Sequence, residues 1–276
     1  MRELPAGLPP LREVIARHGI RATKALGQNF LLDLNLTRKI ARAGGPLRGK
    51  TVLEIGAGPG GLTRALLAEG ADHVLAVERD RRCLAALEEL SAQAPGRLSV
   101  VAADALELDE YDLEPRPDRI IANLPYNIST PLLFKWLDRL ELFEHMVLMF
   151  QKEVAQRIAA TPGAKAYGRL SVMVQWRCRV DALFDLPPRA FTPEPKVTST
   201  VLALEPRATP LAEARAEVLE AVVAAAFGQR RKMLRGSLKQ ISADPLGLLR
   251  RAGLEPTLRA ENLSVEQFCA LARAVA

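Results

Sequence analysis

From residue 50 onward, short apolar segments rich in Val, Ile and Leu alternate with longer amphipathic segments. We predict strands at 51–55, 73–77, 98–102 and 119–122, and helices at 62–68, 81–94 and 131–140. Strands that are apolar along nearly their whole length and are separated by helices form a parallel sheet covered on both faces. The pattern therefore predicts an α/β chain with a doubly wound, mostly parallel sheet.

The strand pattern continues to about residue 204 and then ends. Segments 143–150, 170–176 and 197–204 extend the strand count. After Pro206 the apolar residues recur at helical spacing, and no further strand signal follows. We therefore predict a larger domain over 1–206, with a lead-in segment at 1–49, and a small helical domain over 207–276.

The composition further limits the classes of protein to which this chain can belong. Apolar residues make up 49% and charged residues 25%, as in globular proteins, and no apolar run approaches the ~18–20 residues of a membrane span. The three cysteines are far apart and lack the spacing of a zinc site or a disulfide framework. We expect a reduced, cytoplasmic protein without a metal and, since no dimer motif is obvious, a monomer. The net charge of +6 fits two alternatives, a nucleic-acid partner or an enzyme with a basic surface.

A glycine-rich turn follows the first predicted strand, with the sequence G-A-G-P-G-G from Gly56 to Gly61. Such a turn lets the backbone approach a ligand closely. Glu78 ends the next strand, where its carboxylate can accept both hydroxyls of a ribose. This turn is compatible with two different cofactors. The NAD pattern G-x-G-x-x-G is met by Gly56, Gly58 and Gly61. The G-x-G-x-G loop of S-adenosylmethionine (SAM) enzymes is met by Gly56, Gly58 and Gly60.

The ends of the next two strands favour SAM. Asp104 follows the third strand and can accept a hydrogen bond from an adenine amine, although a helix cap is an equal alternative. Asn123-Leu124-Pro125-Tyr126 follows the fourth strand and fits the amine-methylating pattern [D/N/S]-P-P-[Y/F] with one relaxed position. An NAD dehydrogenase would leave this tetrapeptide without a role.

The tetrapeptide suits methylation of an adenine amine, which is a poor nucleophile. The Asn123 side-chain oxygen and the Leu124 carbonyl, fixed by Pro125, can accept both hydrogens of the amine and favour a pyramidal nitrogen. Tyr126 offers a ring on which the base can stack, worth ~1–3 kcal/mol. We predict that these four residues form the catalytic motif.

In combination, these residues resemble the bacterial small-subunit ribosomal RNA adenine dimethyltransferases of the KsgA/RsmA type. The resemblance covers nearly the whole chain and includes three further motifs, K-A-L-G-Q-N-F-L at 24–31, A-Y-G-R-L-S-V at 166–172 and F-T-P-E-P-K-V-T-S at 191–199. It implies a Rossmann-like, SAM-dependent methyltransferase domain over 1–206 and an RNA-docking helical domain over 207–276.

The resemblance also implies roles for single residues. The implied SAM contacts are Asn29, Leu31, Gly56, Glu78, Asp104 and Asn123. Phe191 would pack on the target adenine opposite Tyr126, whereas the residues alone favour a packed loop position for it. The implied substrate is a pair of adjacent adenines in the 3′-terminal hairpin loop of 16S rRNA, with a role in ribosome biogenesis.

A basic segment in the helical domain is the predicted RNA contact. Residues 227–240 contain five basic side chains and no acidic one: Arg230, Arg231, Lys232, Arg235 and Lys239. On a helix, several of them would form one stripe suited to phosphates, although a charged run of this kind can also merely face solvent.

Two rival functions remain at this point. A 23S rRNA adenine methylase of the macrolide-resistance type shares much of the same pattern, and the helical domain would decide between the two enzymes. A methyltransferase-fold assembly factor without turnover is a different class, which the intact segments 56–60 and 123–126 oppose.

Overall fold

The computed structural model describes residues 8–23 and 26–275, so residues 24 and 25 of the 24–31 motif lie outside the described part. The chain divides into two compact units. The sheet unit comprises the described residues up to Lys152 together with Asp181–Glu205. The helical unit comprises Glu153–Val180 and the described residues from Pro206 onward.

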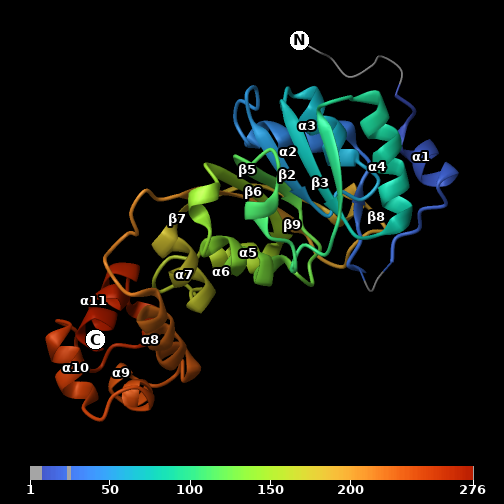
Figure 1. Cartoon of the computed structure of the whole chain (residues 1–276). Coiled ribbons are helices and arrows are strands. Elements are labelled where there is room, and N and C mark those ends of the chain that lie inside the picture. The colour runs from blue at the N-terminus through green and yellow to red at the C-terminus, as the bar shows by residue number, and fades with distance from the viewer. Residues whose placement is uncertain (1–7, 24–25, 276) are drawn as a thin grey trace. The chain divides into compact units, whose positions relative to one another are not determined.

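The sheet unit is built on a seven-stranded sheet with the strand order β4-β3-β2-β5-β6-β9-β7 (Figure 1). The strands are β2 (Thr51–Ile55), β3 (His73–Glu78), β4 (Leu98–Ala102), β5 (Arg119–Asn123), β6 (His145–Gln151), β7 (Cys178–Leu186) and β9 (Ser199–Pro206). The pairings from β4 to β6 are parallel, and β9 runs antiparallel to β6. This confirms the predicted mostly parallel sheet.

The chain winds outward from β2 in both directions, since β3 and β4 lie on one side of it and β5 and β6 on the other. Helices connect the strands: α2 (Leu34–Ala43), α3 (Gly61–Ala68), α4 (Arg81–Gln93) and α5 (Ser129–Leu137). The point where the strand order reverses opens a crevice at the carboxyl ends of the strands, which is where ligands bind in open α/β sheets.

Helix α1 and strand β1 of the lead-in segment both pack on the sheet unit. Helix α1 (Leu11–Arg17) packs Val14 in a small apolar cluster with Cys83 and Ala86 of α4. A two-residue strand, β1 (Phe30–Leu31), pairs antiparallel with β8 (Phe191–Thr192). Residues far apart in the sequence therefore meet beside the carboxyl ends of the central strands.

The helical unit contains α7 (Arg169–Arg177), α8 (Ala216–Gly228), α9 (Leu234–Ser237), α10 (Pro245–Arg251) and α11 (Val265–Val275), and α6 (Lys152–Ile158) leads into it. Its core includes an aromatic chain in which Phe227 lies 6.0 Å from Tyr167 and 5.6 Å from Phe268, between ring centroids. Helices α7 and α11 both pack against α8.

One predicted strand is wrong. Segment 170–176 is part of helix α7, which buries side chains around most of its circumference against α8 and α11. A continuous apolar run does not distinguish a buried strand from a buried helix, which explains the error. The edge strand β7, whose side chains are largely exposed, gave no apolar signal and was not predicted.

The same helix changes the predicted division of the chain. Residues 153–180, which the sequence analysis assigns to the larger domain, cluster with the C-terminal helices. Side chains hold them there, because the Trp176 ring nitrogen donates to the carbonyl of Ala212 at 2.8 Å and the Arg230 guanidinium donates to the carbonyl of Lys165 at 2.7 Å. The later boundary between the two units lies between Glu205 and Pro206.

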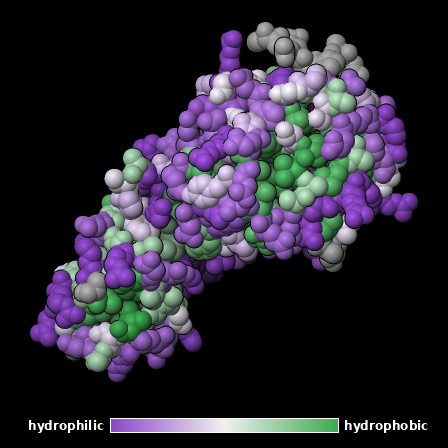
Figure 2. Space-filling model, viewed as in Figure 1, coloured by the Kyte–Doolittle hydropathy of each residue, from purple (hydrophilic) through white to green (hydrophobic). Residues whose placement is uncertain are grey.

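Hydrophilic residues predominate on the surface seen in Figure 2, with smaller apolar areas between them. Large apolar side chains that are exposed include Leu34 of α2 and Leu246 of α10. Among the described residues, no helix has the length and apolar character that crossing a membrane requires.

Candidate active site

A pocket lies at the carboxyl ends of β2, β3, β4 and β5. Its walls come from the loop after β2, from the ends of the other three strands, and from residues 26–30, here termed the N-terminal wall. Nine of the residues predicted for the site line this pocket: Asn29, Gly56, Gly58, Glu78, Asp104, Asn123, Leu124, Pro125 and Tyr126. The sheet topology thus unites motifs spread over about 100 residues of sequence.

The glycines of the β2–α3 loop have backbone conformations that side chains disfavour. Gly56 and Gly58 have φ values of 69° and 56°. A Cβ on Gly56 would lie 3.1 Å from Pro125, and one on Gly58 would lie 3.1 Å from Phe30. The loop can therefore pass this close to the walls of the pocket only as glycine.

Gly60 has a different role from the one its motif suggests. It does not line the pocket but precedes α3 in the left-handed conformation, with φ of 89°. A Cβ there would lie 3.2 Å from Leu90 and 3.3 Å from Leu87, inside the packing of α4. Gly60 positions the loop rather than touching the pocket.

Glu78 is held rigidly at the end of β3 and is buried. One of its carboxylate oxygens accepts from the Gly58 N–H at 2.8 Å, and the other accepts from the N–H groups of Arg79 and Asp80 at 2.8 and 2.9 Å. Each carboxylate oxygen has more than one lone pair, so the fixed carboxylate can still accept hydroxyl groups from a ligand.

Asp104 caps a turn and also lines the pocket. It lines the pocket, and its Oδ1 accepts from the Leu106 N–H at 3.0 Å, which caps the turn after β4. Its Oδ2 forms an ion pair with the exposed Arg79 at 2.7 Å.

Asn123 is oriented by the N-terminal wall. Its Nδ2 donates to the backbone carbonyl of Asn29 at 3.1 Å. A carbonyl oxygen can only accept, so the NH₂ end of the amide must face Asn29. The Oδ1 end is consequently left for the pocket, where it can accept a hydrogen from an amine.

Tyr126 is anchored at its far end. Its hydroxyl shares a hydrogen bond of 2.5 Å with the Ser199 hydroxyl at the start of β9, and burial raises the pKa of the phenol. The aromatic ring is therefore neutral and fixed beside the pocket.

Besides Gly60, two residues predicted as catalytic or cofactor-binding lie outside the pocket. Leu31 and Phe191 face each other in the β1–β8 pairing, and both belong to the apolar core of the sheet unit. The Phe191 side chain is only 2% exposed, so its position is that of a packed residue. Conversely, Gln28, Phe30, Arg79 and Asn127 line the pocket and were not predicted. The 24–31 motif was the available signal for Gln28 and Phe30.

The basic segment after α8 is not the predicted continuous helix. Residues 229–233 form a turn, and Met233 forms an isolated bridge with Arg259. Arg230 is engaged within the helical unit, by an ion pair of 2.9 Å with Glu261 and a hydrogen bond to the Lys165 carbonyl. The other four are exposed: Arg231, Lys232, Arg235 and Lys239.

Comparisons with known proteins show which family the chain belongs to. Residues 19–276 match the family model described as "Ribosomal RNA adenine dimethylase". The chain belongs to this family. It is therefore a methyltransferase with a Rossmann-like fold, as the loop at 56–60 and the tetrapeptide at 123–126 indicated.

Curated relatives are similar over almost their full length. The chain is 62% identical over 269 residues to ribosomal RNA small subunit methyltransferase A of Rhodospirillum rubrum, covering 98% of this chain and 93% of that protein. It is also 62% identical over 270 residues to the protein of the same name from Paramagnetospirillum magneticum, covering 98% and 96%.

Two solved structures are similar in fold and sequence. The dimethyladenosine transferase of Plasmodium falciparum superposes with a TM-score of 0.75 at 28% identity, covering 87% of this chain and 94% of that one. The 23S rRNA methyltransferase ErmE superposes with a TM-score of 0.68 at 29% identity, covering 90% and 99%.

Proposed function

We propose that this enzyme transfers methyl groups from SAM to the N6 atoms of two adjacent adenines in the 3′-terminal hairpin loop of 16S rRNA. The single observation that supports this reaction is the orientation of the Asn123 amide. The Asn29 carbonyl accepts from its NH₂ end, so the amide oxygen is turned toward the pocket. The names of the relatives at 62% identity support the small subunit, or its precursor in the cytoplasm, as the substrate.

The residues that line the pocket support SAM as the ligand. At Gly56 and Gly58 the loop lies too close to the pocket walls for any side chain, so its backbone can approach a ligand. The fixed Glu78 carboxylate is placed to accept the ribose hydroxyls. Asp104, at the end of the neighbouring strand β4, is assigned to the adenine amine. When bound, SAM supplies an electrophilic methyl group.

The protein groups act on the target amine. Asn123 Oδ1 and the Leu124 carbonyl accept the two N6 hydrogens, and this stabilises the pyramidal nitrogen that attacks the methyl group. The Tyr126 ring offers a stacking surface for the base. Positioning the amine in line with the methyl group supplies much of the remaining acceleration. Two methylations of one adenine require space beside N6 for the first methyl group.

The RNA must present an unstacked adenine, because a base inside a helix cannot reach Asn123. A hairpin loop meets this condition. We assign phosphate contacts to the exposed basic residues of the segment after α8, Arg231, Lys232, Arg235 and Lys239, since none of them has an ion-pair partner among the described residues. Arg230 contributes indirectly by fixing this segment to Glu261.

A second candidate is methylation of 23S rRNA, which the similarity to ErmE favours. The deciding experiment offers labelled SAM with unmethylated small ribosomal subunits and, in parallel, with large-subunit rRNA, followed by nucleoside analysis. We expect dimethyladenosine in the small-subunit RNA alone. Label in the large-subunit RNA would establish the second candidate instead. If the protein binds SAM but transfers no methyl group to either RNA, it is a binding factor with a methyltransferase fold and without turnover.

A further inference from the structure

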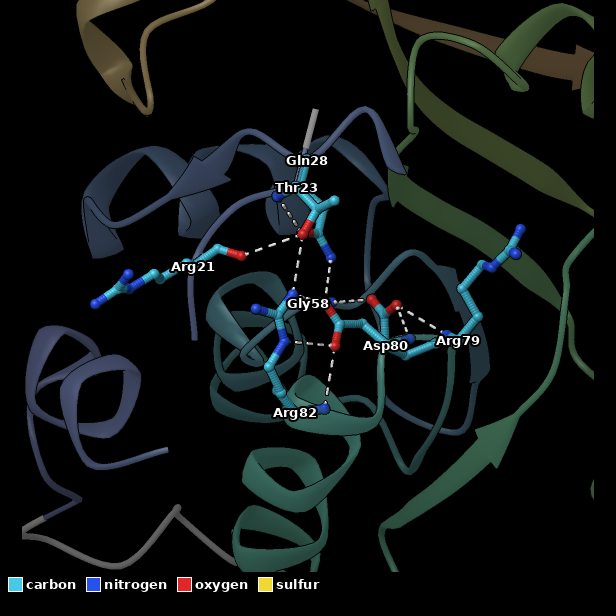
Figure 3. Close-up of polar contacts among 8 residues, drawn as sticks. Arg21, Thr23, Gln28, Gly58, Arg79, Asp80 and Arg82 are labelled. Atoms are coloured by element: carbon cyan, nitrogen blue, oxygen red, sulfur yellow. Dashed lines mark hydrogen bonds and ion pairs between the residues drawn. The ribbon is translucent and has the colours of Figure 1, made fainter. Parts of the chain in front are cut away.

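A polar cluster connects the N-terminal wall to the loop after β3, outside the groups used in the reaction. It consists of Thr23, Gln28, Asp80 and Arg82, here termed the latch. The side chains of Gln28, Asp80 and Arg82 converge in Figure 3. Gln28 and Asp80 are 52 positions apart in the sequence, so only the fold brings them together.

Gln28 bridges the two sides of the latch with both ends of its amide. Its Oε1 accepts from the backbone N–H of Thr23 at 2.8 Å, and its Nε2 donates to Asp80 Oδ2 at 3.0 Å. These two bonds fix the orientation of the amide and join Gln28 to both Thr23 and Asp80.

Asp80 is the charged centre of the latch. Its side chain is 7% exposed and accepts two hydrogen bonds from the Arg82 guanidinium, at 3.0 and 2.6 Å. The hydrogen bonds from Arg82 lower the pKa of Asp80 to about 2, and the Gln28 bond acts in the same direction. The carboxylate is therefore ionised throughout the working pH range. Arg82 in turn donates to the Thr23 hydroxyl at 3.0 Å.

Each end of the latch adjoins a group of the active site. The Asp80 N–H donates to Glu78, the carboxylate assigned to the ribose. Gln28 precedes Asn29, whose carbonyl orients Asn123. The N-terminal wall is also attached by the hydrogen bond from Asn123 to Asn29 and by the two-residue pairing of β1 with β8. The latch thus holds the end of the wall that this short pairing does not reach.

We propose that Gln28 and Asp80 are positioning residues that keep the N-terminal wall closed against the cofactor pocket, and so set the affinity for SAM. This inference rests on the proposed function. If the wall is closed in only a fraction of the molecules, the apparent dissociation constant rises by the inverse of that fraction. Gln28 itself is half-buried at the pocket edge, so the core of the sheet unit does not depend on it.

The test compares Gln28→Glu with the wild type and with Gln93→Ala, a matched control at the exposed end of α4. Gln28→Glu keeps the shape of the side chain but sets a second carboxylate against Asp80. We expect the Kd for SAM, measured by calorimetry, to rise by about tenfold or more, while Tm without SAM stays with the control. Amide exchange at Thr23 should accelerate in the variant without SAM.

The double variant Gln28→Glu/Asp80→Asn exchanges the amide and the carboxylate across the contact. We expect it to restore the SAM Kd toward the wild-type value, which a merely structural role would not predict. An unchanged Kd for SAM in Gln28→Glu overturns the proposal. A rise in Kd that is accompanied by a fall of Tm below that of the control overturns it as well, because a general loss of stability then explains the weaker binding. If the wild type itself binds no SAM, the proposed function fails as well, and the two failures are thereby distinguished.

Discussion

A single backbone carbonyl decides which end of the Asn123 amide faces the pocket. Asn29 lies 94 positions before Asn123, and its carbonyl can receive only the NH₂ end. The acceptor end is thus preorganised to receive a hydrogen bond from the amine of the proposed substrate. Preorganised dipoles of this kind contribute to the rate without reorganising during the reaction.

At the residue scale, we expect Asn123→Ala to lower kcat by about 10²–10³-fold, the usual cost of removing one preorganised group at a reacting centre. SAM should still bind within a few-fold of the wild type, because the other pocket contacts remain. The exposed Asn35→Ala on α2 is the matched control. Turnover close to that of the control would exclude the assigned role of Asn123.

At the element scale, the β2–α3 loop carries two glycines with separable roles. In Gly58→Ala the new Cβ meets Phe30 at the pocket, whereas in Gly60→Ala it meets Leu87 and Leu90 of α4. Both variants force a side chain into the left-handed region, at about 1–2 kcal/mol. We expect Gly58→Ala to raise the SAM Kd and Gly60→Ala mainly to lower Tm. Calorimetry and thermal melts check this, and the reverse pattern would contradict it.

The basic segment after α8 is the second element with a testable role. The triple variant Arg231→Gln/Lys232→Gln/Arg235→Gln should weaken RNA binding by about tenfold or more at low salt. The slope of log K against log salt should fall by ~2, since each single-strand phosphate contact contributes about 0.7. Salt-dependent binding to the small-subunit RNA measures both quantities.

A control variant that loses the same number of positive charges distinguishes RNA contacts made by this segment from an effect of net charge alone. Arg48→Gln/Arg116→Gln/Arg250→Gln removes three exposed positive charges elsewhere in the chain. We expect its salt slope to stay near that of the wild type. Equal slopes for both triple variants would mean that the segment after α8 only faces solvent.

At the scale of the whole molecule, one buried acid links stability to pH. Glu54 lies within β2 beneath the glycine loop and is 2% exposed. Burial, with the nearby negative charge of Glu78, raises its pKa from 4.5 to about 8. Between these values the unfolded chain has released the proton and the folded chain has not. The stability contributed by neutral Glu54 is therefore complete below pH 4.5 and is lost as pH rises toward 8.

Glu54→Gln removes the titrating group and keeps its size. We expect the variant to gain Tm relative to the wild type as pH rises from 5 to 8, corresponding to about 1 kcal/mol or more. Thermal melts at several pH values measure the difference. A constant difference across this range would show that Glu54 does not titrate as stated.

Much of this molecule follows from local sequence. The strands β2 to β6, the helices between them and the glycine loop are set by apolar periodicity and turn residues that act over a few positions. Because parallel strands present their carboxyl ends at one edge, strand order turns these local signals into a common site for Gly56, Glu78, Asp104 and Asn123. The position of the tetrapeptide at 123–126 beside the pocket was therefore predictable.

Other features depend on long-range packing. Segment 170–176 is a helix because α8 and α11 bury it, and local apolarity does not distinguish that state from a strand. Phe191 is buried because β8 pairs with β1. The latch joins residues 52 positions apart, and the Asn29 carbonyl meets Asn123 across 94. Contacts at such separations leave no periodic trace in the sequence, so only the tertiary structure reveals them.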